Sequence, residues 1–178
     1  FILEVELPLL RKINLTNVAK LKQLLKVIAE SAPFVPNVSK LSEHIGVSRN
    51  TFVTYLYYLQ EARLTRNLYK DAKGVTQLQK PDKIFLENTN LQYVLSFRKI
   101  NAGSIRESFF ANQLGRRHLL EYPEKGDFLV DEQYIFEIGG AGKTHKQITG
   151  LDNAFVVKDN MEYGTGKTIP LWLFGFLN

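Results

Sequence analysis

Hydrophobic residues recur every three or four positions in two long segments of the first third of the chain. In TNVAKLKQLLKVIAESAP the apolar positions are Val18, Leu21, Leu24, Leu25 and Ile28, and Pro33 follows the segment. In SRNTFVTYLYYLQEARL the apolar positions are Val53, Leu56 and Leu59, flanked by Phe52 and Tyr55. This spacing is typical of amphipathic helices that bury one face and leave the other in water.

The segment that joins the two long helices predicts a short helix and a turn. A short helix is expected around residues 41–45, followed by a turn at Gly46 and by Ser48 as the N-cap of the second long helix. This order is that of a helix-turn-helix. Two extended runs, at 64–69 and 83–86, surround a polar stretch centred on Asp71 to Gly74 and predict a hairpin, the wing. Residues 16–90 are therefore expected to form a winged helix-turn-helix domain.

The second half of the chain mixes helical and extended segments. After a connector at 91–102 that holds a short helical stretch, the segment GSIRESFFANQL predicts a helix with Ile105, Phe109, Phe110 and Leu114 on its buried side. Extended runs follow in DFLV, QYIFEIGG, NAFVVKD and IPLWLFGFLN, and a short helix is predicted in KTHKQITGLD. This layout predicts an α/β or α+β domain over residues 103–178.

Composition and charge exclude some kinds of site and indicate which partners to expect. The absence of cysteine excludes disulfides and thiolate metal sites, and a cytoplasmic location is expected. The longest apolar run is about half of the ~20 residues that cross a bilayer, so no membrane partner is expected. Residues 1–90 hold 13 Lys and Arg against 8 Asp and Glu, whereas residues 91–178 hold 10 of each. An anionic partner, DNA above all, is expected to bind the first half.

Four segments also resemble a known protein family. They are SKLSEHIGVSRNTFVTYLYYLQEARLTRNLY, KPDKIFLENTNLQYVL, GSIRESFFANQL and GDFLVDEQYIFEIGG. Their order and spacing resemble the C-terminal half of a family of bacterial and archaeal AAA+-type ATPases, over almost the whole chain. In that family the ATPase core precedes a winged helix and a domain of unknown function related to restriction-endonuclease-fold (PD-(D/E)XK) nucleases.

The resemblance implies a domain order for the longer protein. Residues 1–15 would be a tail leading from an upstream ATPase core, which is an expected partner, and residues 103–178 would form a restriction-endonuclease-like mixed-sheet domain. No ATP site is expected in this chain itself. Its GTGKT segment lacks the first glycine of G-x-x-x-x-G-K-T, because Met161 stands there, and a hairpin turn is expected instead.

The resemblance also assigns candidate catalytic residues. Glu107 on the helix, Asp127 at a strand start and Glu137 in the next strand match the carboxylates of these nucleases, and Asp127 and Glu137 would hold Mg²⁺. Such an ion polarises the phosphate and lowers the pKa of the attacking water. The competing interpretation is purely structural: Asp127 is a turn residue, and Glu137 is a polar residue at the end of a strand.

The lysine that these nucleases carry two residues after the glutamate is missing, because Gly139 stands at that position. Lys143 is the candidate replacement, provided that its stem bends back. Gln147 falls where some relatives carry a helical glutamine, whereas Leu151 replaces their tyrosine. Three interpretations stay open here: an active nuclease, a degenerate site that still binds a cation, and no site.

The winged helix carries the candidate nucleic-acid contacts. In a helix-turn-helix the first turn of the second helix faces the bases. The expected contacts are Arg49, Asn50 and Thr51, then Thr54 and Tyr58, with Lys40, Lys70 and Lys73 on phosphates. Glu61 counts against this hypothesis. The alternative is a protein-interaction module that docks on the ATPase core through Tyr55, Tyr57 and Tyr58.

Overall fold

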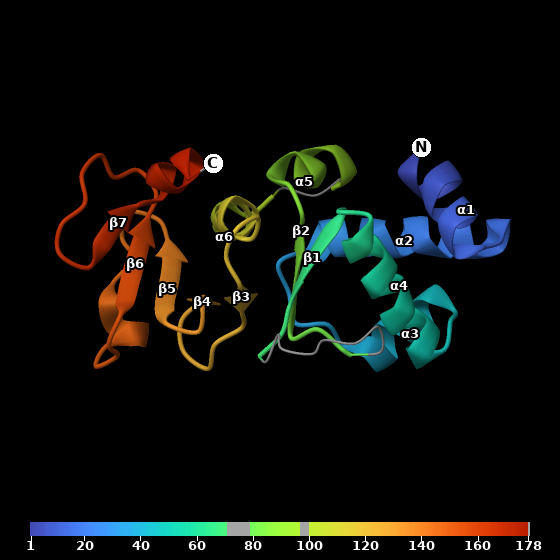
Figure 1. Ribbon diagram of the computed structural model, residues 1–178, viewed down its shortest axis with the longest axis horizontal. Coiled ribbons are helices and arrows are strands. Elements are labelled where there is room, and N and C mark those ends of the chain that lie inside the picture. Colours follow the sequence, from blue (N-terminus) through green and yellow to red (C-terminus); the bar gives the residue numbers. More distant parts are fainter. Residues whose placement is uncertain (71–78, 97–99, 178) are drawn as a thin grey trace. The chain divides into compact units, whose positions relative to one another are not determined.

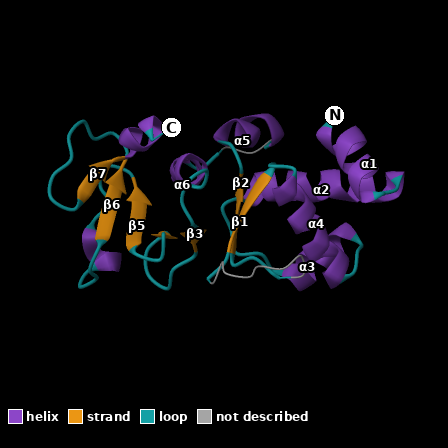
Figure 2. Ribbon diagram, viewed as in Figure 1, coloured by secondary structure: helices purple, strands orange, loops and turns teal. Residues whose placement is uncertain are grey.

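The computed structural model describes residues 1–70, 79–96 and 100–177. The chain is α+β and divides into two compact units (Figures 1 and 2). The first unit consists of Phe1–Asn67 and Gly74–Ile100, and the second of Leu68–Lys73 and Asn101–Asn178. Among the described helices, none combines the length and the apolar character that crossing a membrane requires.

Three helices build the core of the first unit. They are α2 (Leu15–Ser31), α3 (Val38–Ile45) and α4 (Arg49–Glu61), and Figure 1 shows them grouped on one side of the strands of this unit. All ten apolar positions expected from the periodicity of α2 and α4 are buried. Each helix begins at a side chain that accepts a backbone N–H three residues on, namely Asn14, Asn37 and Ser48. Local capping and the apolar stripe together fix these helices.

The turn between α3 and α4 depends on Gly46. Its φ of 70° lies in the left-handed region, and its N–H donates to Glu43 O over 3.0 Å, which ends α3. Glycine adopts this conformation without the steric cost of a Cβ. Lys20 of α2 donates from Nζ to Gly46 O over 2.5 Å, so the turn is also held from the preceding helix.

Two strands follow the helices of the first unit, in the order expected for a winged helix-turn-helix. β1 (Thr65–Leu68) and β2 (Lys83–Leu86) form a two-stranded sheet. Phe34, between α2 and α3, bridges antiparallel to Ile84 through N–H···O bonds of 3.2 and 2.9 Å. The predicted strands are therefore confirmed, and Phe34 adds a third strand segment. The polar stretch at Asp71 to Gly74 lies outside the described residues.

The segment expected to be a tail is helical, the short helical stretch expected in the connector is found as α5, and both pack on the first unit. A π-helical turn, η1 (Ile2–Glu6), leads into α1 (Leu7–Arg11), and Leu7 belongs to the buried core of this unit. In α5 (Thr89–Leu95), the buried Gln92 donates from Nε2 to Ala32 O over 3.1 Å. Both segments therefore contribute contacts to the winged-helix unit.

The second unit is a five-stranded mixed sheet with one long helix, α6 (Ala102–Leu114). The strands, in spatial order, are β3 (Leu120–Glu121), β4 (Phe128–Val130), β5 (Tyr134–Gly139), β6 (Ala154–Lys158) and β7 (Thr168–Pro170). Strands β3, β4 and β5 pair antiparallel, whereas β5, β6 and β7 pair parallel. A 3-10 helix, η2 (His145–Ile148), lies in the connection from β5 to β6.

The two faces of this sheet are covered differently. Phe110 of α6 contacts the rings of Phe128 and Phe136 at centroid distances of 4.9 and 5.1 Å. Ile135, the neighbour of Phe136, packs with Ile148 of η2 instead. Because successive strand residues point to opposite faces, α6 covers one face of β5 and η2 covers the other. Ile105 and Phe109, expected to be buried, are only half-buried.

The end of the chain differs from the expected extended run. Only Thr168–Pro170 is a strand, and Leu171–Phe176 forms the 3-10 helix η3. Its buried side chains, Leu171 and Phe174, are three residues apart, which places them on one side of a helix with three residues per turn. In the GTGKT segment, Thr165 and Thr168 exchange backbone hydrogen bonds of 3.1 and 2.9 Å around a turn.

Candidate nucleic-acid interface and carboxylate–lysine site

The first turn of α4 presents Arg49 and Asn50 to solvent. Ser48 caps the helix, since its Oγ accepts the N–H of Thr51 over 3.1 Å and lies 2.8 Å from Thr51 Oγ1. The capping geometry turns the chain so that residues 49 and 50 point outward. Thr51, expected as a base contact, is instead engaged with the cap.

Further along α4, the structure places two of the expected contacts differently. Tyr58 is half-buried in the core of its unit and lies under the guanidinium of Arg11, 5.4 Å from the ring centre, so it is not on the surface that carries Asn50. Thr54 and Tyr57 are half-buried and follow Asn50 at intervals of four and three, on one helical face. Tyr57 was not predicted on this face, although the spacing indicates it.

Tyr55 is part of the core and not an interface anchor. Its side chain is 3% exposed. Burial raises the pKa of the Tyr55 hydroxyl above its ordinary value, and the neighbouring Tyr58 adds to the shift. The tyrosine therefore stays neutral at physiological pH. Among the three tyrosines proposed as anchors for protein docking, at least this one cannot serve.

Cationic side chains near the start of α4 come from separate segments. Lys40 of α3 is exposed, and Lys80, just before β2, is exposed as well. Lys80 was missed by the sequence analysis, because a lysine at the edge of a polar stretch has no distinguishing pattern. Lys70 is exposed but belongs to the second unit, and Lys73 lies outside the described residues.

In the second unit, Asp127 and Glu137 come from neighbouring strands. The register pairs Phe128 with Phe136, and continuing it by one residue brings Asp127 opposite Glu137 on the face away from α6. Asp127 N–H donates to Phe136 O over 2.8 Å, and Asp127 Oδ2 accepts the N–H of Ile138 over 2.8 Å. One carboxylate oxygen of Asp127 therefore accepts a hydrogen bond from the backbone of β5.

Lys143 reaches back to Glu137. Its Nζ forms an ion pair with Glu137 Oε1, and the two side chains are 29% and 2% exposed. A Cβ built on Gly139 would lie 2.6 Å from the Lys143 stem, so this stem occupies the space that a side chain at 139 would fill. Gln147, with its amide nitrogen facing the carboxylate, donates to Glu137 Oε2 over 3.1 Å. Lys143 and Gln147 therefore contact the buried Glu137 carboxylate from two sides.

The three expected carboxylates do not form a metal centre. Within the described ranges, no group of three or more His, Asp and Glu side chains is arranged to hold a metal ion. Glu107 lies on α6, which packs on the opposite face of the sheet from Glu137. Glu107 is therefore not grouped with Asp127 and Glu137 as a metal ligand, and its catalytic role stays a prediction, whereas Lys143 pairs with Glu137 as expected.

Adding a single methyl group at Gly139 is expected to destabilise the protein. Gly139→Ala should lower the free energy of unfolding by about 1–2 kcal/mol, because overpacking displaces the Lys143 stem from Glu137. Gly142→Ala is the matched control, since a Cβ there meets no atom within 4 Å. Urea unfolding followed by the fluorescence of Trp172, the only tryptophan, reports on the second unit. Equal midpoints for the two variants would contradict the packing described for Gly139.

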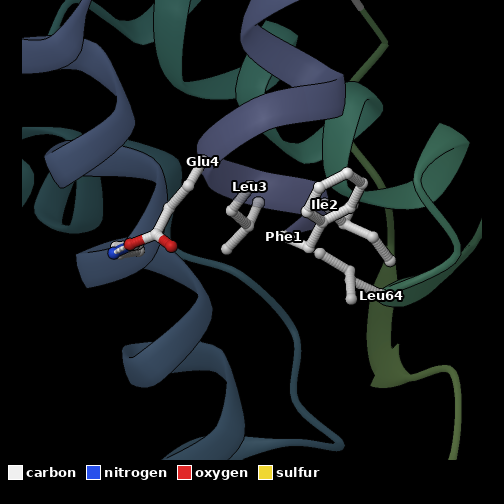
Figure 3. Close-up of a pocket in the computed structure, with 6 residues that line it drawn as sticks. Phe1, Ile2, Leu3, Glu4 and Leu64 are labelled. Carbon is white, nitrogen blue, oxygen red and sulfur yellow. Dashed lines mark hydrogen bonds and ion pairs between the residues drawn. The ribbon is translucent and has the colours of Figure 1, made fainter.

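A separate hollow of about 410 Å³ lies beside the N-terminal turn (Figure 3). Its lining is mostly apolar, with Phe1, Ile2, Leu3 and Leu64. The polar lining residues, Glu4 and Lys22, form an ion pair with each other. Because its charged groups satisfy one another, this hollow offers little chemistry for recognising a charged ligand.

The matched family coincides with the first unit. Residues 3–99, more than half of the chain, match a family described as Domain of unknown function (DUF8612). The chain belongs to the DUF8612 family. The DUF8612 match takes in α2, α3, α4, both wing strands and α5, and it ends before α6. No curated protein and no solved structure matches the chain.

Proposed function

We propose that this chain is a nucleic-acid-binding regulatory module that contacts duplex DNA with the N-terminal end of α4. The observation that carries the proposal is the exposure of Arg49 and Asn50 beside the Ser48 cap. In the part of the chain that the structure describes, neither side chain has a hydrogen-bond or ion-pair partner. Asparagine pairs bidentately with adenine in the major groove, and arginine contacts both guanine and backbone phosphates.

The charge around this helix start supports the same proposal. Lys40 and Lys80 are exposed and could reach phosphates on either side of a groove occupied by α4. The excess of positive charge in the chain lies within residues 1–90, which include most of the first unit. Binding should therefore contain a large electrostatic part that weakens as salt is raised.

The second unit is proposed to be a degenerate relative of the restriction-endonuclease-like nucleases. The sheet order, the pair Asp127 and Glu137 on adjacent strands, and the lysine on Glu137 support this kinship. Glu137 is nearly inaccessible and is neutralised by Lys143, which favours a structural role over Mg²⁺ binding. The resemblance to AAA+-type ATPases further suggests that the chain acts beside an ATPase core.

The test is the affinity of the 178-residue chain for a labelled 20-base-pair duplex, measured by fluorescence anisotropy at several salt concentrations. Arg49→Ala should weaken binding about tenfold, because it removes a charged contact worth about 1.4 kcal/mol. Arg63→Ala is the matched control. Arg63 is exposed beyond the other end of α4, about 20 Å along the helix from Arg49.

Three results separate the alternatives. Salt-dependent binding that falls with Arg49→Ala and not with Arg63→Ala supports the proposal. Absence of duplex binding at 50 mM salt would overturn it in favour of a protein-interaction module. Cleavage of plasmid DNA with Mg²⁺ that is lost in Glu137→Gln would establish the active nuclease instead.

A further inference from the structure

A polar hollow of about 380 Å³ lies at the edge of the proposed DNA-binding surface. It is lined by residues 35–39, Arg49 and Lys80. These residues come from three separate places in the sequence: the segment that enters α3, the first residue of α4, and the approach to β2. Folding of the winged helix therefore brings two cations to the border of one hollow.

The described residues do not neutralise these two cations. In the described part of the chain, neither Arg49 nor Lys80 forms an ion pair or a side-chain hydrogen bond. No Asp or Glu is among the described residues that line the hollow. Two like charges on one concave surface repel each other unless an anion lies between them, so this arrangement favours an anionic ligand.

The remaining polar lining fits an oxyanion. Ser39, exposed on the first turn of α3, adds a hydroxyl that can donate a hydrogen bond. The Asn37 oxygen is already used, because it accepts the N–H of Lys40 over 3.1 Å. A charge-assisted hydrogen bond from Arg49, an ammonium from Lys80 and the Ser39 hydroxyl are together typical of phosphate recognition.

From this geometry we propose that one backbone phosphate of the bound nucleic acid occupies the hollow, held between Arg49 and Lys80. This inference rests on the proposed function and makes it more specific. Arg49 is then assigned to the phosphate backbone and not to a base, and base contacts fall to the exposed Asn50 and to the half-buried Thr54 and Tyr57 on the same face of α4. Lys80 fixes the position of the wing base on the same phosphate. The hollow would set the register of the helix in the groove and would not read sequence.

The first experiment uses inorganic phosphate as the probe, followed by NMR on the ¹⁵N-labelled chain at constant ionic strength. The amide signals of Ser39, Arg49 and Lys80 should shift together and saturate. The Arg49→Gln, Lys80→Gln double variant should lose the saturation, whereas Arg63→Gln should keep it. Shifts spread over all exposed lysines, or no shift at the three amides, would overturn the site.

The second experiment measures duplex affinity against salt for both single variants and the double variant. Each single variant should bind about five- to tenfold more weakly than the wild type. Because one phosphate is shared, the double variant should reduce the salt slope by about one and not by two. A slope reduced by two would mean two separate phosphates and would overturn the shared site.

The two experiments also separate this inference from the proposed function. Saturable phosphate binding by a chain that does not bind duplex DNA would overturn the nucleic-acid function and support the anion site. If Lys80→Gln binds the duplex as tightly as Arg63→Gln does, the nucleic-acid function is supported. The contact between Lys80 and the phosphate is then overturned.

Discussion

Replacing Phe110 by alanine is expected to lower the free energy of unfolding of the second unit by about 4 kcal/mol. The Phe110 side chain is fully buried, and its ring lies 4.9 Å from Phe128, 5.1 Å from Phe136 and 4.8 Å from Phe174. The substitution removes the residue that joins α6, two strands and η3, and it leaves a cavity at their junction. Urea unfolding monitored by Trp172 fluorescence measures the loss.

The control for Phe110 is another phenylalanine of the same unit. Phe176 is 77% exposed, so Phe176→Ala should change the unfolding free energy by no more than about 0.5 kcal/mol. A Phe110→Ala variant as stable as Phe176→Ala would contradict the assignment of Phe110 to the centre of this core.

Replacing Lys143 by methionine is expected to cost about 2–3 kcal/mol of stability at neutral pH. Methionine keeps an unbranched apolar stem over Gly139 but removes the ammonium that pairs with Glu137. The Glu137 carboxylate is 2% exposed and would be left as a buried charge without its ion-pair partner. Gln147 would still donate a hydrogen bond, which limits the loss.

Two further variants show whether the effect comes from this pair. Lys146→Met, at an exposed position of η2, should be nearly neutral. The double variant Lys143→Met, Glu137→Gln should recover most of the stability, because a neutral amide is cheaper to bury than a carboxylate. If Lys143→Met alone lowers the free energy of unfolding no more than Lys146→Met does, the buried ion pair does not stabilise the protein.

The helices and strands of the first unit could be predicted because their signals are local. The spacing of Leu21, Leu24 and Ile28 specifies the buried face of α2, and Ser48 followed by polar residues specifies the start of α4. The third strand segment at Phe34 could not be predicted. It is a single bridge to Ile84, fifty residues away, and no local pattern marks it.

The carboxylate site could be predicted only in part for a similar reason. Asp127 and Glu137 follow from strand pairing, but the position of Lys143 depends on the path of the turn at Gly140 to Lys143, closed by a 3.0 Å hydrogen bond. The position of Glu107 could not be predicted, because the sequence does not say which face of the sheet α6 covers. The packing of Tyr58 could not be predicted, because Arg11, which covers it, lies in a segment expected to be a tail.

We propose above all that the first unit binds duplex DNA with the N-terminal end of α4. Hydrogen exchange of the whole chain, measured by mass spectrometry with and without a saturating 20-base-pair duplex at low salt, tests it most directly. The account predicts that DNA slows exchange in peptides covering the start of α3, residues 49–57 and Lys80, and leaves β5 unchanged. Unchanged exchange in all of these peptides, or protection confined to the second unit, would contradict it.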